Sequence, residues 1–460
     1  MVQRALTSHP GLAQARITVR RAQASLRAEE GLLVPQLRVE TSWLANNEPT
    51  EGLFESGIRE SDLYQANASV SWRLPWGSDV SIQTDAARFR AVQPIEFGGT
   101  RQTQTIGPNW QEHLNLTLRQ PVLRGFGRDV NLAPENIARE RLELAQIQLE
   151  QTASAAVLEV LAGFYELSYS QRDVAIKERQ LEIARDQREA TVALVEAGTL
   201  APVEIDAVDQ RIVVLQEALL LAEHDRDTKN RDLARLLEMG VATADPNLGA
   251  QDTPRTLTES LEAAYSRSPQ LGAIREQIDA QRLVLGTRDD AILPQLDLTA
   301  SVGQNGLDRS FGGAAGQVLG LDATRWFLGA VLTMPLDNAR AHQLATSDRL
   351  ELDRLQIELQ STRERLRVDI EAAHALVTVN GRRLDLTQRS VELSERTLEA
   401  ERSRFKAGRS TNQRVLQYQE ELERAEVRHA RTQVDRELSV LRLLHLTGGL
   451  LPRYGLEIVP

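Results

Sequence analysis

The hydrophobic and polar positions along this chain of 460 residues follow two periods, and each period occurs in both halves of the chain. The stretches 131–196 and 341–406 carry apolar side chains at helical spacing and contain few Gly or Pro residues. They predict two helices, each on the order of 100 Å long at 1.5 Å per residue. Return helices are predicted at 203–239 and 412–446, so each half contains an antiparallel helical hairpin.

The period changes from helical to two after each of two Pro-Gln-Leu segments, at 35–37 and 294–296. Alternating apolar and polar side chains predict strands with one face in water. The first half contains an additional alternating pair, joined at Pro75-Trp76-Gly77, and the Gly-rich segment around Gly312-Gly313 is expected to be a loop. The predicted strands are 37–44, 67–74, 80–87, 110–119, 296–302 and 326–334.

These elements occur in the same order twice, which indicates two tandem structural repeats. Residues 5–37 match residues 264–296 after a shift of 259 positions. We therefore assign residues 1–250 to a first repeat and residues 251–460 to a second repeat, each composed of helix, strands, long helix, turn and return helix.

The start of the chain differs between the repeats. Thr256 and Glu259 predict a capping box at the first helix of the second repeat, whereas the first repeat has no such start after Met1. We therefore expect a signal peptide upstream of this chain. No run approaches the roughly 20 apolar residues that a membrane helix needs, so any membrane span is expected to be built from strands.

The two long helices carry apolar residues at a spacing of seven, which is the coiled-coil period. In the second repeat one ladder of such residues begins at Val377 and another at Val379; their counterparts begin at Leu167 and Tyr169, and Arg188 interrupts the first of these. Ladders displaced by two residues lie about 200° apart around a helix. Each long helix is therefore expected to be a stave of a closed tube, the alternative being a solitary hairpin with one seam.

Composition restricts the classes of function. A net charge of −11 and basic residues interleaved with acidic ones disfavour nucleic acid as a partner. The absence of cysteine excludes thiol catalysis, thiolate metal sites and disulfides. The seven histidines are scattered and no Ser or carboxylate has a recognisable nucleophile setting, so we expect no enzyme, no cofactor and no metal site.

The tryptophans are confined to the strand-forming parts of the chain. This distribution is typical of the aromatic girdle of a membrane β-barrel, although strands favour aromatic residues in any protein. The predicted girdle residues are Trp43, Trp72, Trp76, Trp110 and Trp326.

The order of elements over essentially the whole chain resembles the TolC-like outer-membrane efflux proteins. The motifs that carry this resemblance are the duplicated Pro-Gln-Leu segments, the sequence Gln-Pro-Val-Leu-Arg-Gly-Phe-Gly at 120–127, and the paired Ala-Gly turns at Gly198 and Gly408. The resemblance implies a mostly α-helical fold: a trimeric coiled-coil tunnel continued by a twelve-stranded outer-membrane β-barrel, shared between chains because four strands alone would leave open edges in lipid. Whether the additional hairpin of the first repeat enlarges this barrel or projects from it stays open.

The resemblance also implies roles for the two helix turns. They are expected to form a periplasmic tip where an adaptor protein docks, and residues shortly after each turn are expected to constrict the pore. A Glu204–Arg414 pair would hold the tip closed, and the alternative is that both are solvated surface charges. The tip residues are Ala197, Gly198, Thr199, Ala407, Gly408 and Arg409, and the gate residues are Glu204, Arg414 and Gln417.

The expected function is therefore that of an outer-membrane channel-tunnel in a tripartite efflux or type I secretion system. Three copies of the chain would act as a passive exit duct for substrates that an inner-membrane transporter delivers through a periplasmic adaptor. Its location would be the outer membrane, in contact with lipid, with a large periplasmic part. The alternatives are a periplasmic adaptor, which needs only one helical hairpin and more β domains, and a structural coiled-coil protein.

Overall fold

The computed structural model describes residues 6, 9–51, 56–97, 100–237 and 256–456. They divide into two compact units, and each unit combines segments from both repeats. The helical unit comprises Met1–Arg21, Glu143–Arg275 and Gln356–Pro460, and the sheet unit comprises Ala22–Leu142 and Glu276–Leu355.

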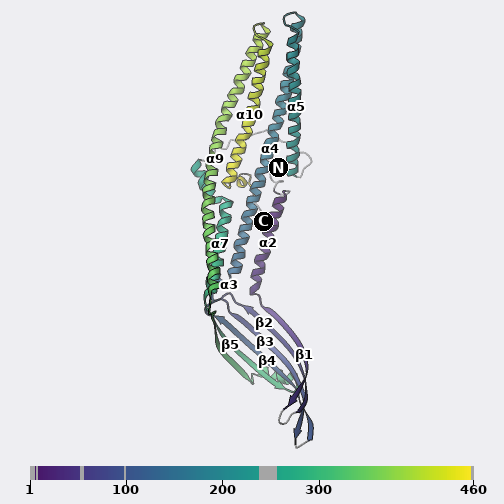
Figure 1. The fold of residues 1–460 in the computed structure, drawn as a ribbon, viewed down its shortest axis with the longest axis vertical. Coiled ribbons are helices and arrows are strands. Elements are labelled where there is room, and N and C mark those ends of the chain that lie inside the picture. Colours follow the sequence, from purple (N-terminus) through teal and green to yellow (C-terminus); the bar gives the residue numbers. More distant parts are fainter. Residues whose placement is uncertain (1–5, 7–8, 52–55, 98–99, 238–255, 457–460) are drawn as a thin grey trace. The chain divides into compact units, whose positions relative to one another are not determined.

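The sheet unit contains one antiparallel sheet, in which six strands of the described chain follow one another in sequence order (Figure 1). The strands are longer than the alternation predicted, mainly at their outer ends. The additional hairpin, β2 with β3, lies between β1 and β4 and is hydrogen-bonded to both, so it extends the sheet and does not project from it. The strands are β1 Gln36–Glu51, β2 Ser56–Arg73, β3 Asp79–Phe97, β4 Thr100–Pro121, β5 Gln295–Asp308 and β6 Thr324–Thr333.

Near the helix end of the sheet, two successive rows of paired residues show that the two faces differ in polarity. One row crosses all six strands with apolar side chains only: Leu37, Val70, Ile82, Leu116, Val302 and Trp326. The adjacent row, one residue along each strand and on the opposite face, carries polar side chains or glycine: Arg38, Ser69, Gln83, Asn115, Gly303 and Arg325. The alternation predicted from the sequence is therefore confirmed, with a period of two residues because strand side chains alternate between faces.

The segment around Gly312 and Gly313 forms a helix, so the prediction of a loop was wrong. The hydroxyl of Ser310 accepts a hydrogen bond of 3.1 Å from the Gly313 amide and caps the helix. The helix covers the end of the β5 strand, where Gly306 leaves room for the backbone of Ala314. Glycines disfavour an isolated helix, and packing against the sheet outweighs this local preference.

The helices begin and end close to the predicted positions. The second return helix has the predicted bounds, and the capping box of Thr256 and Glu259 is present with both of its hydrogen bonds. The helices are α2 Pro10–Glu30, η1 Gly31–Leu33, α3 Arg128–Asn131, α4 Ala133–Glu196, α5 Val203–Leu236, α6 Leu257–Arg267, α7 Pro269–Ile292, α8 Phe311–Gly320, α9 Ala339–Lys406, α10 Asn412–Leu446 and α11 Leu450–Arg453.

The core of the helical unit consists of thin clusters between neighbouring helices. Leu181 and Ala184 of α4 pack against Leu215 of α5. Leu398 and Phe405 of α9 belong to a cluster with α10 that also includes Leu194 of α4 and Leu200, just after the first tip turn. No helix among the residues that the structure describes is long and apolar enough to cross a membrane.

Both ladders of α4 contain buried residues within one chain, but only one ladder of α9 does. Leu167 and Ile176, from the two ladders of α4, are both buried. On α9 the ladder that includes Val377 and Leu398 is buried, whereas Leu386 and Leu393 of the other ladder are more than 60% exposed. The ladder of α9 that contains Leu386 and Leu393 is therefore not covered by another helix of the described chain.

Candidate functional site

The two tip turns have the same backbone geometry. Gly198 and Gly408 have φ angles of 74° and 68°, in the left-handed region where a Cβ would be strained. In each turn two successive amides bond back to the end of the preceding helix: Gly198 to Val195 at 2.9 Å and Thr199 to Leu194 at 2.9 Å, and equivalently in the second repeat. Such bonds satisfy the last carbonyls of a helix and reverse the chain. All six predicted tip residues are exposed.

Replacing Gly198 by Ala is expected to destabilise the first tip turn by about 1 kcal/mol, because a Cβ is disfavoured in the left-handed region. No other atom lies within 4 Å of the position a Cβ would take, so backbone strain is the only cost. Amide hydrogen exchange should become roughly five times faster in the turn. Gly381→Ala, in the middle of α9 with the same open surroundings and without a positive φ, is the control and should leave exchange unchanged or slower. Equal behaviour of the two variants would contradict the role of φ.

The predicted gate residues lie at the starts of the two return helices. Glu204 is half-buried in the first turn of α5, while Arg414 and Gln417 are exposed on α10. Within one chain, the described residues include no Glu204–Arg414 ion pair shorter than 4.0 Å. The Ser410 hydroxyl, and to a smaller extent the charges of Arg404 and Arg414, hold the pKa of Glu401 below its ordinary value. A contact of Glu204 with Arg414 of another chain stays a prediction.

A buried asparagine, which no sequence motif marks, connects the two helical hairpins beside the predicted gate residues. Asn412, the first residue of α10, is 1% exposed. Its carbonyl oxygen accepts a hydrogen bond of 2.9 Å from Gln187 of α4, and its amide nitrogen donates to the backbone oxygen of Glu204 at 3.4 Å. An asparagine at a helix start is usually a cap, so its position gave no signal for this contact between hairpins.

A second connection lies further along the hairpins, where Glu423 of α10 sits between two cations. Its carboxylate accepts from Lys177 of α4 at 2.5 Å and from Arg211 of α5. All three side chains are less than 20% exposed. Burial alone would raise the pKa of Glu423, but hydrogen bonds and charge from Lys177 and Arg211 outweigh it and hold the pKa below its ordinary value. This carboxylate therefore holds three helices together in its ionised form.

Further ion pairs continue along the same contact between α4 and α10. Arg179 bonds Glu426 at 2.9 Å, and Arg431 bonds both carboxylate oxygens of Glu166 at 2.8 and 3.0 Å. From Gln187–Asn412 to Glu166–Arg431 the residue numbers rise along α10 and fall along α4, as expected of antiparallel helices. The sequence signal for this contact was the presence of opposite charges, in opposite order, along the stretches that form α4 and α10.

At the helix end of the sheet, hydrogen bonds connect the motif at 120–127 to the β2–β3 turn and to α7. The Gly125 amide donates to both carboxylate oxygens of Asp290 at 3.1 and 3.0 Å, and the Gly127 amide donates to the Trp76 carbonyl at 3.1 Å. Asn131 donates to the carbonyls of Gly125 and Gly127, each at 2.8 Å. Burial raises the pKa of Asp290, although the Gly125 amide and the charge of Arg124 oppose this.

Four of the predicted girdle residues lie on the apolar face of the sheet, in two groups. Trp43 and Trp110 share one row with Tyr64 and Arg88, and Trp43 stacks on Tyr64 with ring centroids 5.8 Å apart. Trp326 lies in the row of Leu37, six residues nearer the helix end of the strands, or about 20 Å at 3.3 Å per residue. Trp72 lies on the same face, in the next row toward the helix end of the strands, and Trp76 lies in the β2–β3 turn.

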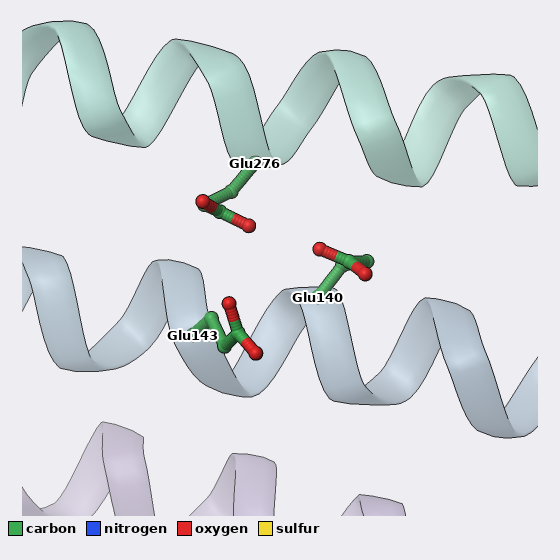
Figure 2. Close-up of side chains that lie close together, drawn as sticks. All are labelled: Glu140, Glu143 and Glu276. Carbon is green, nitrogen blue, oxygen red and sulfur yellow. The ribbon is translucent and has the colours of Figure 1, made fainter.

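Three glutamates lie close together near the start of α4. Glu140 and Glu143 lie one helical turn apart on α4, and Glu276 projects from α7 (Figure 2). One carboxylate oxygen of each lies within 4.8 Å of the others, but none of the three is buried. Acidic groups that are not fully buried are common on helical surfaces without an ion, so this cluster provides no evidence for a metal.

Comparison with known proteins gives consistent matches. The family model described as outer membrane efflux protein matches residues 260–449. The outer membrane efflux protein BepC of Brucella suis biovar 1 (strain 1330) is 20% identical over 419 residues, which cover 90% of this chain and 85% of BepC.

Solved structures match over nearly the whole chain. The Campylobacter jejuni CmeC outer membrane channel is 15% identical, with a TM-score of 0.65, and the match covers 98% of this chain and 85% of CmeC. A membrane protein from Pseudomonas aeruginosa is 16% identical, with a TM-score of 0.69 and coverage of 97% and 89%. The Vibrio cholerae outer membrane protein VceC is 16% identical, with a TM-score of 0.65 and coverage of 97% and 95%. At these identities the likeness establishes the fold.

Proposed function

We propose that this chain, whose resemblance to the TolC-like outer-membrane efflux proteins is confirmed, is the outer-membrane channel-tunnel of a tripartite efflux or type I secretion system. Three copies would form a passive duct, and an inner-membrane pump would deliver the substrate through a periplasmic adaptor. The chain would do no chemistry of its own, because the substrate only has to pass. Its place would be the outer membrane, with the helical unit in the periplasm.

The observation that carries this proposal is the unpartnered apolar surface at two edges of the helical unit. On α9, Leu386 and Leu393 are 63% and 61% exposed and lie seven residues apart. On α5, Val213 and Leu220 are 63% and 66% exposed at the same spacing. Exposed apolar stripes with the coiled-coil period require helical partners. Pairing α9 of one chain with α5 of the next would cover both stripes and close a tube.

The sheet unit supports the same conclusion. Near the helix end its two faces differ in the way that a membrane barrel requires, with apolar side chains toward lipid and polar side chains toward a water-filled interior. The row that contains Arg38, Gln83 and Arg325 would line the interior, and the row that contains Leu37 and Ile82 would face lipid. A periplasmic adaptor has no need for such a sheet.

Adaptor docking is proposed at the tip, beside the two exposed turns. A groove of about 500 Å³ runs between α4 and α9 there, and its lining includes Ala190, Ala193, Arg402 and Lys406. The α4 wall also carries Ile183, Leu194, Asp186 and Gln187, and the α9 wall also carries Phe405. A groove that combines apolar side chains with charged ones of both signs suits an amphipathic helix. The proposed occupant is therefore the helical hairpin of the adaptor, next to Gly198 and Gly408.

The proposal is tested by reconstituting the purified trimer in a planar bilayer and recording ion conductance. We expect a small conductance for the unaltered protein, because the tip is closed in the absence of a pump. Arg414→Glu should raise the conductance and the preference for cations, because three acidic side chains would repel one another across the throat. Restoring opposite charges with Glu204→Arg in the same chain should lower it again if the two side chains meet between neighbouring chains.

Two results would count against different parts of this proposal. If neither the unaltered protein nor any tip variant conducts, the duct function is wrong. If Arg414→Glu raises the conductance and Glu204→Arg changes it by the same amount with and without Arg414→Glu, the duct function is retained. The two side chains then do not interact, and the Glu204–Arg414 pair is not the gate.

A further inference from the structure

The additional hairpin of the first repeat is built like the other strands of the wall. β2 pairs with β1 from Gln36↔Ser71 to Glu51↔Ser56, and β3 pairs with β2 from Arg73↔Asp79 to Glu60↔Val92. The β2–β3 turn is held at the helix end of the sheet by the Trp76–Gly127 hydrogen bond. The hairpin therefore extends from the helix end along the full length of its neighbours.

The side chains of the hairpin also have the pattern of a membrane wall. Val70 of β2 and Ile82 of β3 lie in the apolar row between Leu37 of β1 and Leu116 of β4. On the other face Ser81 lies in line with Thr117 of β4. A hairpin that projected into water would have no reason to keep an apolar face in register with the membrane strands.

The exposure of the apolar row shows where further neighbours are missing. In the interior strands, Ile82, Leu116 and Val302 are 43%, 43% and 44% exposed, since each has a strand on both sides. At the edges, Leu37 of β1 is 71% exposed and Trp326 of β6 is 78% exposed. The strands whose apolar side chains lack a neighbouring strand are therefore β1 and β6, and not the two strands of the hairpin.

We infer that the trimer closes an eighteen-stranded barrel, in which each chain contributes six strands and β6 of one chain pairs with β1 of the next. This rests on the proposed function, and it departs from the twelve strands that the family resemblance implies. Six strands alternate in direction, so β6 runs opposite to β1 and the closure is antiparallel throughout, as open edges in lipid require.

The consequence is a wide exit. Barrel diameter grows roughly linearly with strand number, so eighteen strands give about 1.5 times the diameter of twelve, and barrels of that size hold an aqueous channel. The membrane segment would then not limit the size of the substrate, and the narrowest point would lie in the helical tunnel. Cargo bulkier than a small molecule could leave through such an opening.

The inference is tested by labelling single cysteines, which the cysteine-free chain allows without background. Ser81→Cys and Ile82→Cys probe the two faces of β3, and Thr117→Cys and Leu116→Cys are the matched pair on β4. Trimers in intact outer membranes are treated with a water-soluble, membrane-impermeant maleimide. We expect Ser81→Cys to react like Thr117→Cys, and Ile82→Cys to be protected to the same degree as Leu116→Cys.

The possible contrary results separate the inference from the function it rests on. If Ile82→Cys reacts as fast as Ser81→Cys while Leu116→Cys stays protected, the hairpin lies in water and the eighteen-stranded barrel is wrong, although the channel stands. If the β4 pair shows no alternation, or the protein is not recovered as outer-membrane trimers, both fail. Electron cryo-microscopy of the unaltered trimer gives an independent count at membrane level: eighteen strands are expected, and twelve would overturn the inference.

Discussion

Replacing Glu423 by Gln is expected to destabilise the contact of α10 with α4 and α5 by about 3 kcal/mol. The change leaves Lys177 and Arg211, both largely buried, without their common counter-ion, and removing one partner of a buried pair is strongly destabilising. Hydrogen exchange of the α10 amides around this position should become about 100 times faster. Glu421→Gln is the matched control, because it makes the same change at an exposed position of the same helix and should alter stability by less than about 0.5 kcal/mol.

The same carboxylate predicts how the contact responds to acid. The pKa of Glu423 is lowered in the folded protein, so its stabilising effect is fully present above the pKa of the unfolded chain and is lost as the pH falls through the folded value. The helical contact should therefore weaken as the pH is lowered below 4.5, the ordinary value for a glutamate. The Glu423→Gln variant should lack this part of the pH dependence. An unchanged acid response in the variant, or equal exchange rates for Glu423→Gln and Glu421→Gln, would refute the role assigned to Glu423.

Replacing Gly77 by Ala is expected to prevent most chains from assembling into folded trimers. Gly77 has a φ of 96°, and a Cβ there would lie inside contact distance of the Gly125 carbonyl oxygen and 2.7 Å from the Asn131 amide nitrogen. The left-handed conformation alone costs about 1–2 kcal/mol for a residue with a Cβ, and the contact with backbone adds to this. The loss should be visible as a reduced yield of outer-membrane trimers on semi-native gels.

Gly286→Ala serves as the control for this variant, since it also lies in the sheet unit, within α7, and has no atom within 4 Å of the added Cβ. It should assemble normally and gain up to about 1 kcal/mol from better helix propensity. If Gly77→Ala assembles as well as Gly286→Ala, the close approach of the β2–β3 turn to the motif at 120–127 is not needed for assembly.

Local features of this protein were accessible from the sequence by itself. The bounds of α10, the capping box at Thr256, the reversals at Gly198 and Gly408 and the alternation along the strands all follow from residues that are close together in the chain. Side-chain period, capping and a positive φ are properties of a short segment, so no distant partner is needed to recognise them.

The sequence was less informative where packing decides the local structure. The outer ends of β1 to β4 extend beyond the alternating segments, because backbone pairing with a neighbouring strand continues where the side chains no longer alternate. The helix α8 was predicted as a loop, because its glycines are poor helix formers and its packing on β4 and β5 explains the helix.

The partners of each element were decided by the tertiary structure alone. The sequence left open whether the additional hairpin joins the sheet, and the register places it between β1 and β4. It also did not place Glu423 between Lys177 and Arg211, which are more than 200 positions away in the chain. Periodicity specifies which face of a helix or strand is apolar, but many partners can cover an apolar face. The choice among them depends on register and on pairing of buried charges between distant segments, which arise only when the chain is folded.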